Sequence, residues 1–391
     1  YTVKDTLSLH DALPISGSLF SAPEQLATMQ PRDLSSHVEY TPGRGIEEVA
    51  RDLGLDPADL VKLSSNENPY GASPAAVDAV HDAADDISVY PKAAHTDLTA
   101  ALADEWGVEP EQVWVSPGAD GAIDYLSRAM LDPDDRVLVP EPGFSYYGMS
   151  ARYHHGETET YPLSKDDEFA TTADGILDAY DGERLVFVTS PHNPTGATMP
   201  REEIEALLDG VDEETLVVLD EAYGEFASEP SGVDLLSEVD NLAVLRTFSK
   251  AYGLAGLRIG YAVVPRAWAD AYAKVSTPFA ASEAALRAAL AALDDDEHIE
   301  KSVEGAAWAR EHIRAELDAP TYPSEANFVL CEVGDGSAVA EAAQQEGVIV
   351  RDCTSFGLPT CVRVSCGTEE ETRRAVETLN EILADRPVAE A

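Results

Sequence analysis

The stretch VLRTFSKAYGLAGLRIGYAVV, Val244 to Val264, decides the fold because it sets two charged residues between two apolar runs. Lys250 follows the strand-like run Leu242 to Leu245, and Arg258 precedes the strand-like run Ile259 to Val264. In an open α/β sheet, ligands bind at the carboxyl ends of the strands. We therefore expect Lys250 and Arg258 to face one site at such an edge.

The surrounding sequence, from about Ser65 to Val264, alternates short apolar runs with amphipathic segments. Segments such as DGAIDYLSRAML and PREEIEALLDG have the helical period. The alternation is typical of an α/β fold whose mostly parallel sheet is covered by helices on both faces. The expected strands are Val113 to Ser116, Arg136 to Pro140, Leu185 to Thr189, Leu216 to Asp220, Leu242 to Thr247 and Ile259 to Val264.

The pattern changes after Glu283, where Ala-rich helical stretches precede three apolar runs, NFVLCEV, GVIVRDC and CVRVSCG, and a final helix from Glu369 to about Ala384. Residues 1–28 are less acidic and show no sustained period, whereas MQPRDLSSHVEY from Met29 is typical of a native start. We expect residues 1–28 to be a non-native or disordered extension, residues 65–284 a large α/β domain, and residues 29–64 with 285–391 a smaller α+β domain.

The formal net charge of -47 over 391 residues is spread along the chain rather than collected in a tail. Such a surface argues against nucleic acid and anionic membranes as partners, since both need basic surfaces. It is typical of a folded protein in a salt-rich cytoplasm, where ions screen self-repulsion. No run of about 18 apolar residues and no cleavable leader occurs, so we expect a cytoplasmic protein with small-molecule ligands.

The four cysteines, Cys331, Cys353, Cys361 and Cys366, have no CxxC pair and no partnering histidine pattern. We expect reduced, mostly buried thiols rather than a disulfide framework or a structural zinc. The sequence also lacks the HExxH and GxxxxGK[ST] motifs. It therefore argues against a metalloenzyme and a phosphate-binding NTPase.

Three further polar groups follow the expected strands. Asp220 ends the run LVVLD, where a carboxylate either caps the next helix or, if buried, requires a cationic or hydrogen-bonding partner. Asn193 lies in SPHNPTG, which turn formation explains equally well, although its amide could donate to an oxygen in the crevice. In VSPGADG the amides of Ala119 and Asp120 begin a helix and could bind a phosphate, provided that the Asp120 side chain points elsewhere.

Lys250 is the decisive residue because the chain has only seven lysines. A solvated surface lysine is the ordinary interpretation. Lys250, however, lies between Phe248 and the segment Ala251 to Gly253 at a strand end, which favours a lysine that forms a Schiff base. A lysine amine, a buried carboxylate, an amide donor, a phosphate cradle and Arg258 together match one ligand, pyridoxal phosphate.

The motifs, in this order, resemble the fold-type I pyridoxal-phosphate-dependent aminotransferases from about Ser36 to Ala384. They are LSSNENPYGASP, YPKAAHTDL, SPHNPTG, DEAYGEF, RTFSKAYGLAGLRIGYAV, ANFVL and CVRVSCGT. Within the family they are most similar to the branch that acts on histidinol phosphate. The resemblance implies an aspartate-aminotransferase-like fold, pyridoxal 5'-phosphate as cofactor, and a ping-pong exchange of amino groups between L-histidinol phosphate and 2-oxoglutarate in histidine biosynthesis.

The resemblance also implies a role for each residue that matches a motif. Lys250 is the Schiff-base lysine and proton shuttle, and Asp220 keeps the pyridine nitrogen protonated. Asn193 and Tyr223 hydrogen-bond the phenolic oxygen. Phe144 stands where the family usually stacks a tyrosine or tryptophan on the ring, and it keeps the aromatic contact. The phosphate is held by the backbone amides of Ala119 and Asp120 with Thr247, Ser249 and Arg258.

Substrate and subunit contacts are implied in the same way. Arg363 in CVRVSCG matches the arginine that clamps a substrate carboxylate through two parallel N–H groups. Tyr70 in NENPYG corresponds to a tyrosine that reaches the phosphate of the neighbouring subunit, which implies a homodimer with its active site at the interface. Arg351 and Arg44 could serve a substrate phosphate or be solvated or structural. The expected substrate-binding residues are Arg363, Arg351, Tyr40, Asn68 and Asn327.

Three alternatives stay open on the sequence alone. An aromatic or broad-range aminotransferase would need an apolar substrate pocket in place of a second anion site. A lyase similar to threonine-phosphate decarboxylase would break the bond from Cα to the carboxylate, and release of CO₂ would identify it. A non-catalytic binding protein on the same fold has no need for Lys250 beside a buried acid, so the retention of Lys250, Asp220 and Arg258 together argues against it.

The acidic composition predicts a fold that depends on salt. The screening distance grows from about 3 Å at 1 M to about 30 Å at 0.01 M ionic strength, so removing salt lets the acidic side chains repel one another. We expect the melting temperature, followed by circular dichroism, to fall when the salt is lowered from molar to millimolar. An equal melting temperature in both solutions would contradict this explanation.

Overall fold

The computed structural model describes residues 34, 35, 37, 45–92 and 95–385. The expected extension at residues 1–28 lies outside the described residues, as do Tyr40 and Arg44. The chain separates into two units, Tyr1–His37 and Val38–Ala391, and the fold below is that of the second unit.

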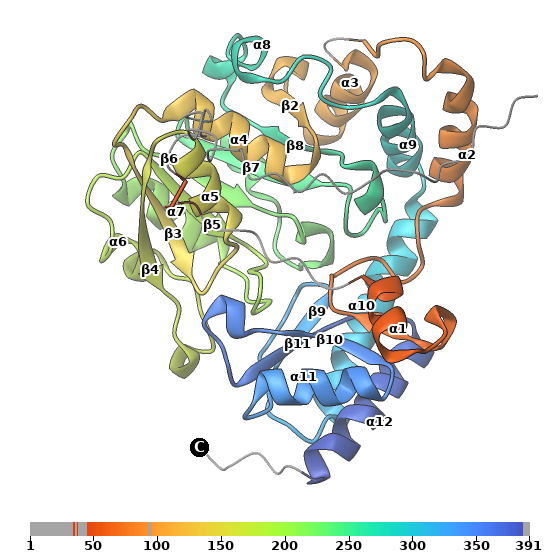
Figure 1. Cartoon of the computed structure of the whole chain (residues 1–391). Helices are drawn as coiled ribbons and strands as arrows, with labels where there is room; N and C mark the ends of the chain where they lie inside the picture. The colour runs from red at the N-terminus through yellow and green to blue at the C-terminus, as the bar shows by residue number, and fades with distance from the viewer. Residues whose placement is uncertain (1–33, 36, 38–44, 93–94, 386–391) are drawn as a thin grey trace, which may run out of the picture. The chain divides into compact units, whose positions relative to one another are not determined.

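A seven-stranded sheet of order β2-β8-β7-β6-β5-β3-β4 is formed by the middle part of the chain (Figure 1). Its strands are β2 (Val113–Ser116), β3 (Arg136–Glu141), β4 (Glu157–Pro162), β5 (Leu185–Thr189), β6 (Leu216–Asp220), β7 (Leu242–Thr247) and β8 (Gly260–Val263). All neighbouring strands are parallel except that β8 runs antiparallel to both β2 and β7. The expected α/β class with a mostly parallel sheet is confirmed.

The edge strand β4 is the one strand of this sheet that the apolar runs do not predict. Its residues, ETETYP, are mostly exposed, and it pairs with β3 at the end of the sheet. An edge strand has a neighbour on one side alone and meets solvent on the other, so it does not need a continuous apolar run.

Helices cover both faces of the seven-stranded sheet because successive strand residues point to opposite faces. On β5, Leu185 and Phe187 belong to one apolar cluster, whereas Val186 and Val188 belong to another. The cluster of Phe187 contains residues of α4 (Gly118–Met130), α5 (Tyr146–Tyr153) and α8 (Tyr272–Val275). The cluster of Val186 contains residues of α2 (Pro74–Ala83), α3 (Thr96–Trp106), α6 (Ala173–Leu177), α7 (Arg201–Gly210) and α9 (Glu283–Leu293). Burial on both sides explains why the central strands are apolar throughout.

A second sheet, four-stranded and of order β1-β10-β11-β9, joins the two ends of the described chain. Its strands are β1 (Val61–Leu63), β9 (Phe328–Glu332), β10 (Val348–Asp352) and β11 (Cys361–Ser365). Strand β1 runs parallel to β10 and pairs Val61 with Val348. The apolar cluster of this sheet includes residues of α10 (Asp296–Glu316), α11 (Gly336–Gln345) and α12 (Glu369–Asp385), and α1 (Ile46–Leu53) packs beside Ile349. Domain boundaries at residues 64/65 and 284/285 stay a prediction.

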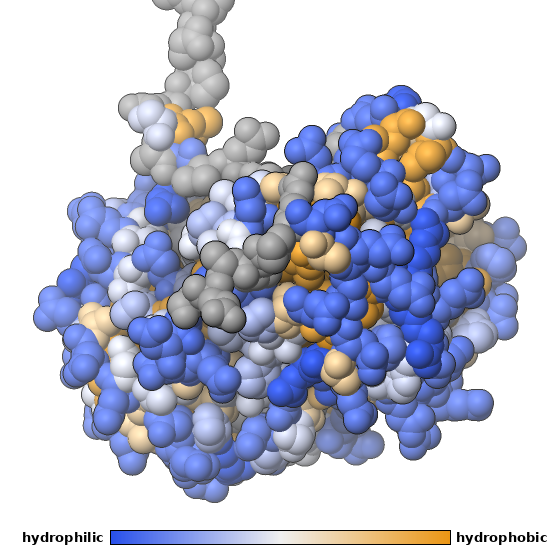
Figure 2. All heavy atoms as spheres, turned by 90° about the horizontal axis from the view of Figure 1, so that it is seen from below, coloured by the Kyte–Doolittle hydropathy of each residue, from blue (hydrophilic) through white to orange (hydrophobic). Residues whose placement is uncertain are grey.

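The surface and the cysteines agree with the composition. The face drawn in Figure 2 is mostly hydrophilic, as an acid-rich sequence requires. All four cysteines are buried and unbonded, as expected. Among the residues that the structure describes, no helix combines the length and the apolar character needed to cross a bilayer.

The fold predicts a large loss of stability when Trp114 of β2 is truncated. Trp114 is fully buried, and the ring centroids of Trp268 and Tyr272 each lie 5.9 Å from its own. Truncation of a buried tryptophan to alanine costs about 3–5 kcal/mol because it leaves a cavity. We expect Trp114→Ala to lose this much free energy of unfolding in a denaturant titration at constant high salt.

Trp308→Ala is the matched control for this prediction. Trp308 is partly exposed and stacks on the ring of His312 at a centroid distance of 5.0 Å. The same truncation should therefore cost less there. Equal losses in the two variants would contradict the packing described for β2.

Candidate active site

A cavity of about 760 Å³ lies at the carboxyl ends of the parallel strands. Thr189, Asp220 and Thr247, the last residues of β5, β6 and β7, all line it. The second sheet contributes Arg351 from β10 and Arg363 from β11. The predicted site residues found in its wall are Ala119, Asp120, Phe144, Asn193, Asp220, Tyr223, Thr247, Ser249, Lys250, Arg258, Arg351 and Arg363.

Lys250 lies three residues beyond the end of β7, and its amine nitrogen is 5.6 Å from the centre of the Tyr223 ring. Burial, together with the positive charge of Arg363, lowers the pKa of Lys250 to about 8. An amine with this pKa is neutral in a sizeable fraction of molecules near pH 8, and the neutral form is the nucleophile. Lys250 can therefore both attack a carbonyl carbon and exchange a proton near neutral pH.

Asp220 is 4% exposed and accepts two hydrogen bonds, from the Tyr147 hydroxyl at 2.7 Å and from the Ala222 amide at 3.0 Å. The Tyr147 hydroxyl also lies 2.8 Å from the Thr189 hydroxyl. Burial raises the pKa of Asp220 to about 6, although both hydrogen bonds oppose the rise. A buried carboxylate of this kind is stabilised by a protonated nitrogen on a ligand.

Tyr223 is oriented by Asn66, a residue that the sequence did not identify. The Asn66 amide donates to the Tyr223 hydroxyl at 3.0 Å, and the Ser365 hydroxyl donates to the side-chain oxygen of Asn66 at 2.9 Å. Asn66 has a φ of 53°, in the left-handed region that asparagine tolerates better than most residues. These contacts connect the segment after β1, which carries Asn66, and strand β11, which carries Ser365, to the cavity residue Tyr223.

An anion cradle forms where α4 begins at Gly118, whose φ is 77°. A Cβ at Gly118 would lie 2.4 Å from Nη2 of Arg258, so glycine lets the guanidinium approach the helix end. Arg258 lies 3.5 Å from the Ser249 hydroxyl, which in turn accepts a hydrogen bond from Thr247 at 3.0 Å. A helix N-terminus, two hydroxyls and a guanidinium together suit a phosphate.

The sequence predicts a phosphate site at this helix start only if the Asp120 side chain points away from it. The structure differs, because Asp120 points toward the cradle. Its carboxylate accepts a hydrogen bond from Arg258 at 3.0 Å. Burial raises the pKa of Asp120, although Arg258 and Lys250 oppose the rise. An anion bound here must share Arg258 with the Asp120 carboxylate.

Arg351 and Arg363 are direct partners across β10 and β11, so both side chains leave the same face of the sheet. Arg363 is 5% exposed and donates to the side-chain oxygen of Asn193 at 2.5 Å and to the backbone oxygen of Ser64 at 3.0 Å. Arg351 donates to the Ser355 hydroxyl at 3.1 Å. Two neighbouring guanidinium groups suit a ligand with two anionic ends, and Asn193 keeps its N–H groups for a ligand oxygen.

Three predicted residues, Asn68, Asn327 and Tyr70, are not among those that line the cavity. The Asn68 amide donates to the backbone oxygen of Ala251 at 2.7 Å, and the Asn327 amide donates to that of Asn66 at 3.1 Å. Both asparagines thus brace segments that carry cavity residues. Their contact with substrate, and that of Tyr70 with a neighbouring subunit, stay predictions.

Lys62, Glu67 and Tyr147 line the cavity without having been predicted. The Lys62 amine lies 2.7 Å from the Glu67 carboxylate, and the charge of Glu67 acts to raise the pKa of Lys250. The scarcity of lysine was a usable signal for Lys62, four residues before NENPYG begins. No sequence signal distinguishes Tyr147 from an ordinary core tyrosine, since its role comes from contact with the distant Asp220.

Comparison with known sequences finds close relatives along most of the chain. The family described as aminotransferase class I and II matches residues 58–379. The histidinol-phosphate aminotransferase of Haloferax volcanii is 71% identical over 361 residues, which cover 92% of this chain and 100% of the relative. The protein of the same name from Methanococcoides burtonii is 40% identical over 357 residues, which cover 90% of this chain and 98% of the relative.

Solved structures have the same architecture. The histidinol-phosphate aminotransferase of Sinorhizobium meliloti, in complex with pyridoxal-5'-phosphate, superposes with a TM-score of 0.81 at 28% identity, covering 93% of this chain and 99% of that chain. A single mutant of the Thermus thermophilus aspartate aminotransferase superposes with a TM-score of 0.79 at 26% identity, covering 91% and 100%.

The raised pKa of Asp220 predicts a pH-dependent cost of its charge in the cofactor-free protein. Below the unfolded pKa near 4, Asp220 is protonated in both states and its charge has no effect on stability. Between that value and about 6 the unfolded chain ionises first, so the folded protein loses stability as the pH rises. We therefore expect the free energy of unfolding of Asp220→Asn to rise, relative to that of the parent, by about 1–3 kcal/mol between pH 4 and pH 7.

The measurement is a denaturant titration of both proteins, free of cofactor and in constant high salt, at several pH values. The difference in the free energy of unfolding should level off above the folded pKa. Asp352→Asn is the control, because burial acts to raise the pKa of that partly buried carboxylate but its hydrogen bonds outweigh burial and lower the pKa. A difference for Asp220→Asn that does not change with pH would refute the assignment.

Proposed function

The chain belongs to the class I and II aminotransferases, and we propose that it transfers the amino group of L-histidinol phosphate to 2-oxoglutarate, giving imidazole acetol phosphate and L-glutamate. One observation carries the proposal: the Lys250 amine shares a cavity with two neighbouring guanidinium groups, those of Arg351 and Arg363. The relatives named histidinol-phosphate aminotransferase support the choice of substrate. The reaction belongs to histidine biosynthesis.

The residues of the cavity fit pyridoxal phosphate as the cofactor. Asp220 is a buried acceptor with a raised pKa, and the Gly118 end of α4 with Arg258 is a cradle that a Cβ would block. When bound, pyridoxal phosphate supplies an aldehyde that bonds to amines and a ring that withdraws electrons from that bond. Asp220 would hold a proton on the ring nitrogen, and Asn193 and Tyr223 would donate to the phenolic oxygen.

Lys250 supplies the amine and the proton transfer that the exchange requires. Its pKa of about 8 lets the side chain give up and regain a proton close to neutral pH. Phe144 lies in the wall and presents an aromatic ring for stacking against the cofactor. The loop of Asn68 holds the backbone after Lys250 through the Ala251 oxygen, which limits the movement of the amine.

Arg363 and Arg351 would recognise the anionic ends of the substrates. Histidinol phosphate carries a phosphate and no carboxylate, whereas 2-oxoglutarate carries two carboxylates, so both substrates need cations at a distance from the reacting carbon. We assign Arg363 to a carboxylate, which its planar fork matches, and Arg351 to the substrate phosphate or the second carboxylate. Lys62 adds a third cation to the same wall.

We also propose that the enzyme is a cytoplasmic homodimer in which Tyr70 reaches the cofactor phosphate of the partner subunit. The large domain, residues 65–284, would bind the cofactor, and residues 29–64 with 285–391 would form the small domain. Tyr70 does not line the cavity of its own chain, which supports a role in the site of a partner subunit.

The proposal predicts a two-step spectroscopic cycle. The purified protein should absorb in the near-visible range, histidinol phosphate should shift that band, and 2-oxoglutarate should restore it, because each half-reaction leaves the cofactor in a different form. Lys250→Ala should lose turnover while keeping its fold, and Lys274→Ala, which removes an exposed lysine, should keep both.

Three results would count against the proposal. Turnover by Lys250→Ala near that of the parent would exclude Lys250 as the reacting amine. A band that aromatic amino acids shift and histidinol phosphate does not would indicate an aromatic aminotransferase. Release of CO₂ in place of amino transfer would indicate a lyase.

A further inference from the structure

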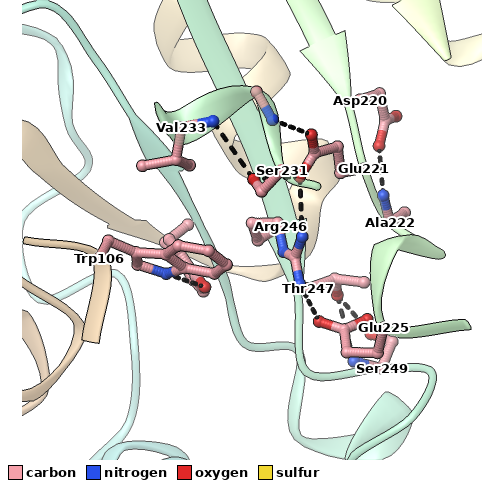
Figure 3. A network of polar contacts seen from close by, with 12 residues as sticks. Trp106, Asp220, Glu221, Ala222, Glu225, Ser231, Val233, Arg246, Thr247 and Ser249 are labelled. Carbon is pink, nitrogen blue, oxygen red and sulfur yellow. Dashed lines mark hydrogen bonds and ion pairs between the residues drawn. The ribbon is translucent and has the colours of Figure 1, made fainter. Parts of the chain in front are cut away.

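A buried ion network lies next to the cavity residues Asp220 and Thr247 (Figure 3). Arg246 of β7 donates to Glu221 at 2.7 Å through one terminal nitrogen and to Glu225 at 2.7 Å through the other. All three side chains are at most 8% exposed. The guanidinium also lies over the ring of Trp106, 4.9 Å from its centre.

The alternation of strand residues places this network beside the site without exposing it to the cavity. Asp220 and Thr247 line the cavity. Glu221, which follows Asp220, and Arg246, which precedes Thr247, point to the other side and do not line it. The backbone amide of Glu221 donates to the oxygen of Leu245 at 3.0 Å. The ends of β6 and β7 are therefore joined twice, once through the backbone and once through the ion pair.

Two members of the network, Glu221 and Arg246, are held from several sides. Glu221 accepts a hydrogen bond from the Ser231 hydroxyl at 2.6 Å and from the Gly232 amide at 2.7 Å. A Cβ at Gly224 would lie 2.5 Å from Nη1 of Arg246, and the guanidinium is held between two carboxylates and the ring of Trp106. Figure 3 shows the three charged groups converging in this space.

We infer that Arg246 is a positioning residue of the proposed reaction, which fixes the end of β6 against the end of β7 through Glu221 and Glu225. The β6 end carries Asp220 and Tyr223, and the β7 end carries Lys250. The inference rests on the proposed function, in which Asp220 and Lys250 act on different atoms of one rigid, planar cofactor. A buried ion pair is seldom the most stable way to fill such a space, but its two-armed geometry restricts how the joined segments can move.

The test compares Arg246→Lys with the parent, both saturated with pyridoxal phosphate. Lysine keeps the charge and cannot make two parallel hydrogen bonds to two carboxylates. We expect kcat to fall by about 10²-fold, the effect of a misplacement of about 1 Å, with little change in KM for histidinol phosphate, because the substrate cations are untouched. The visible absorbance band should also shift, since Asp220 no longer meets the ring as before. Glu225→Gln, a milder change that keeps the Glu221 arm, should show the same pattern at smaller size.

Arg136→Lys is the matched control. Arg136 also contacts two acids, Asp181 at 3.1 Å and Glu183 at 3.4 Å, and it lies at the amino end of β3, opposite the cavity. The Arg136→Lys variant should keep the parent's kcat and absorbance band, even if it loses as much stability as the Arg246→Lys variant. If Arg246→Lys and Glu225→Gln are folded, bind cofactor and keep both the band and kcat, the inference is overturned. A parent protein without a visible band would instead refute the proposed function.

Discussion

The register of three parallel strands is the constraint on which the site depends. Strands β5 and β6 pair Thr189 with Asp220, so these two strands end at one level, and β6 pairs Asp220 with Leu245 of β7, which runs two residues further to Thr247. A slip of one residue would turn every side chain to the opposite face, exchanging Asp220 for Glu221 and Thr247 for Arg246. The register is protected because both faces of these strands are buried in separate apolar clusters. Core packing and site geometry therefore have the same origin.

Much of the fold follows from the sequence because burial on two faces leaves a strong local pattern. The runs around Leu185, Leu216 and Leu242 could be located as strands, and the polar residues that follow them could be placed at one edge. The exposed strand β4 lacks that pattern, and the reversed direction of β8 is a matter of pairing that no local signal carries. The boundaries of buried elements could therefore be predicted from the sequence, whereas those of exposed elements could not.

The site divides in the same way. Lys250, Asp220 and Arg258 are noticeable in the sequence because each lies near the end of an apolar run, and lysine is rare in this chain. Tyr147 and Asn66 are not, since their functions arise from contacts with Asp220 and Tyr223 across long stretches of chain. The orientation of Asp120 toward Arg258 could not be foreseen either, because Arg258 lies 138 residues further along the chain. Residue type can thus be read locally, whereas the partner of a residue requires the fold.

The pairing of β1 with β10 bears on the order in which the protein can form during synthesis. Val61 of β1 pairs with Val348 of β10, so β1 leaves the ribosome long before β10, the strand that completes its backbone hydrogen bonds. Contacts between such distant segments form slowly, because a long loop must be closed first. The seven-stranded sheet draws its strands from residues 113–263 and can pair them while the rest is still being made. Residues 61–70, which carry Lys62, Asn66 and Glu67 of the cavity, must therefore wait for the last part of the chain, and a truncated nascent chain holds the sheet without a complete site.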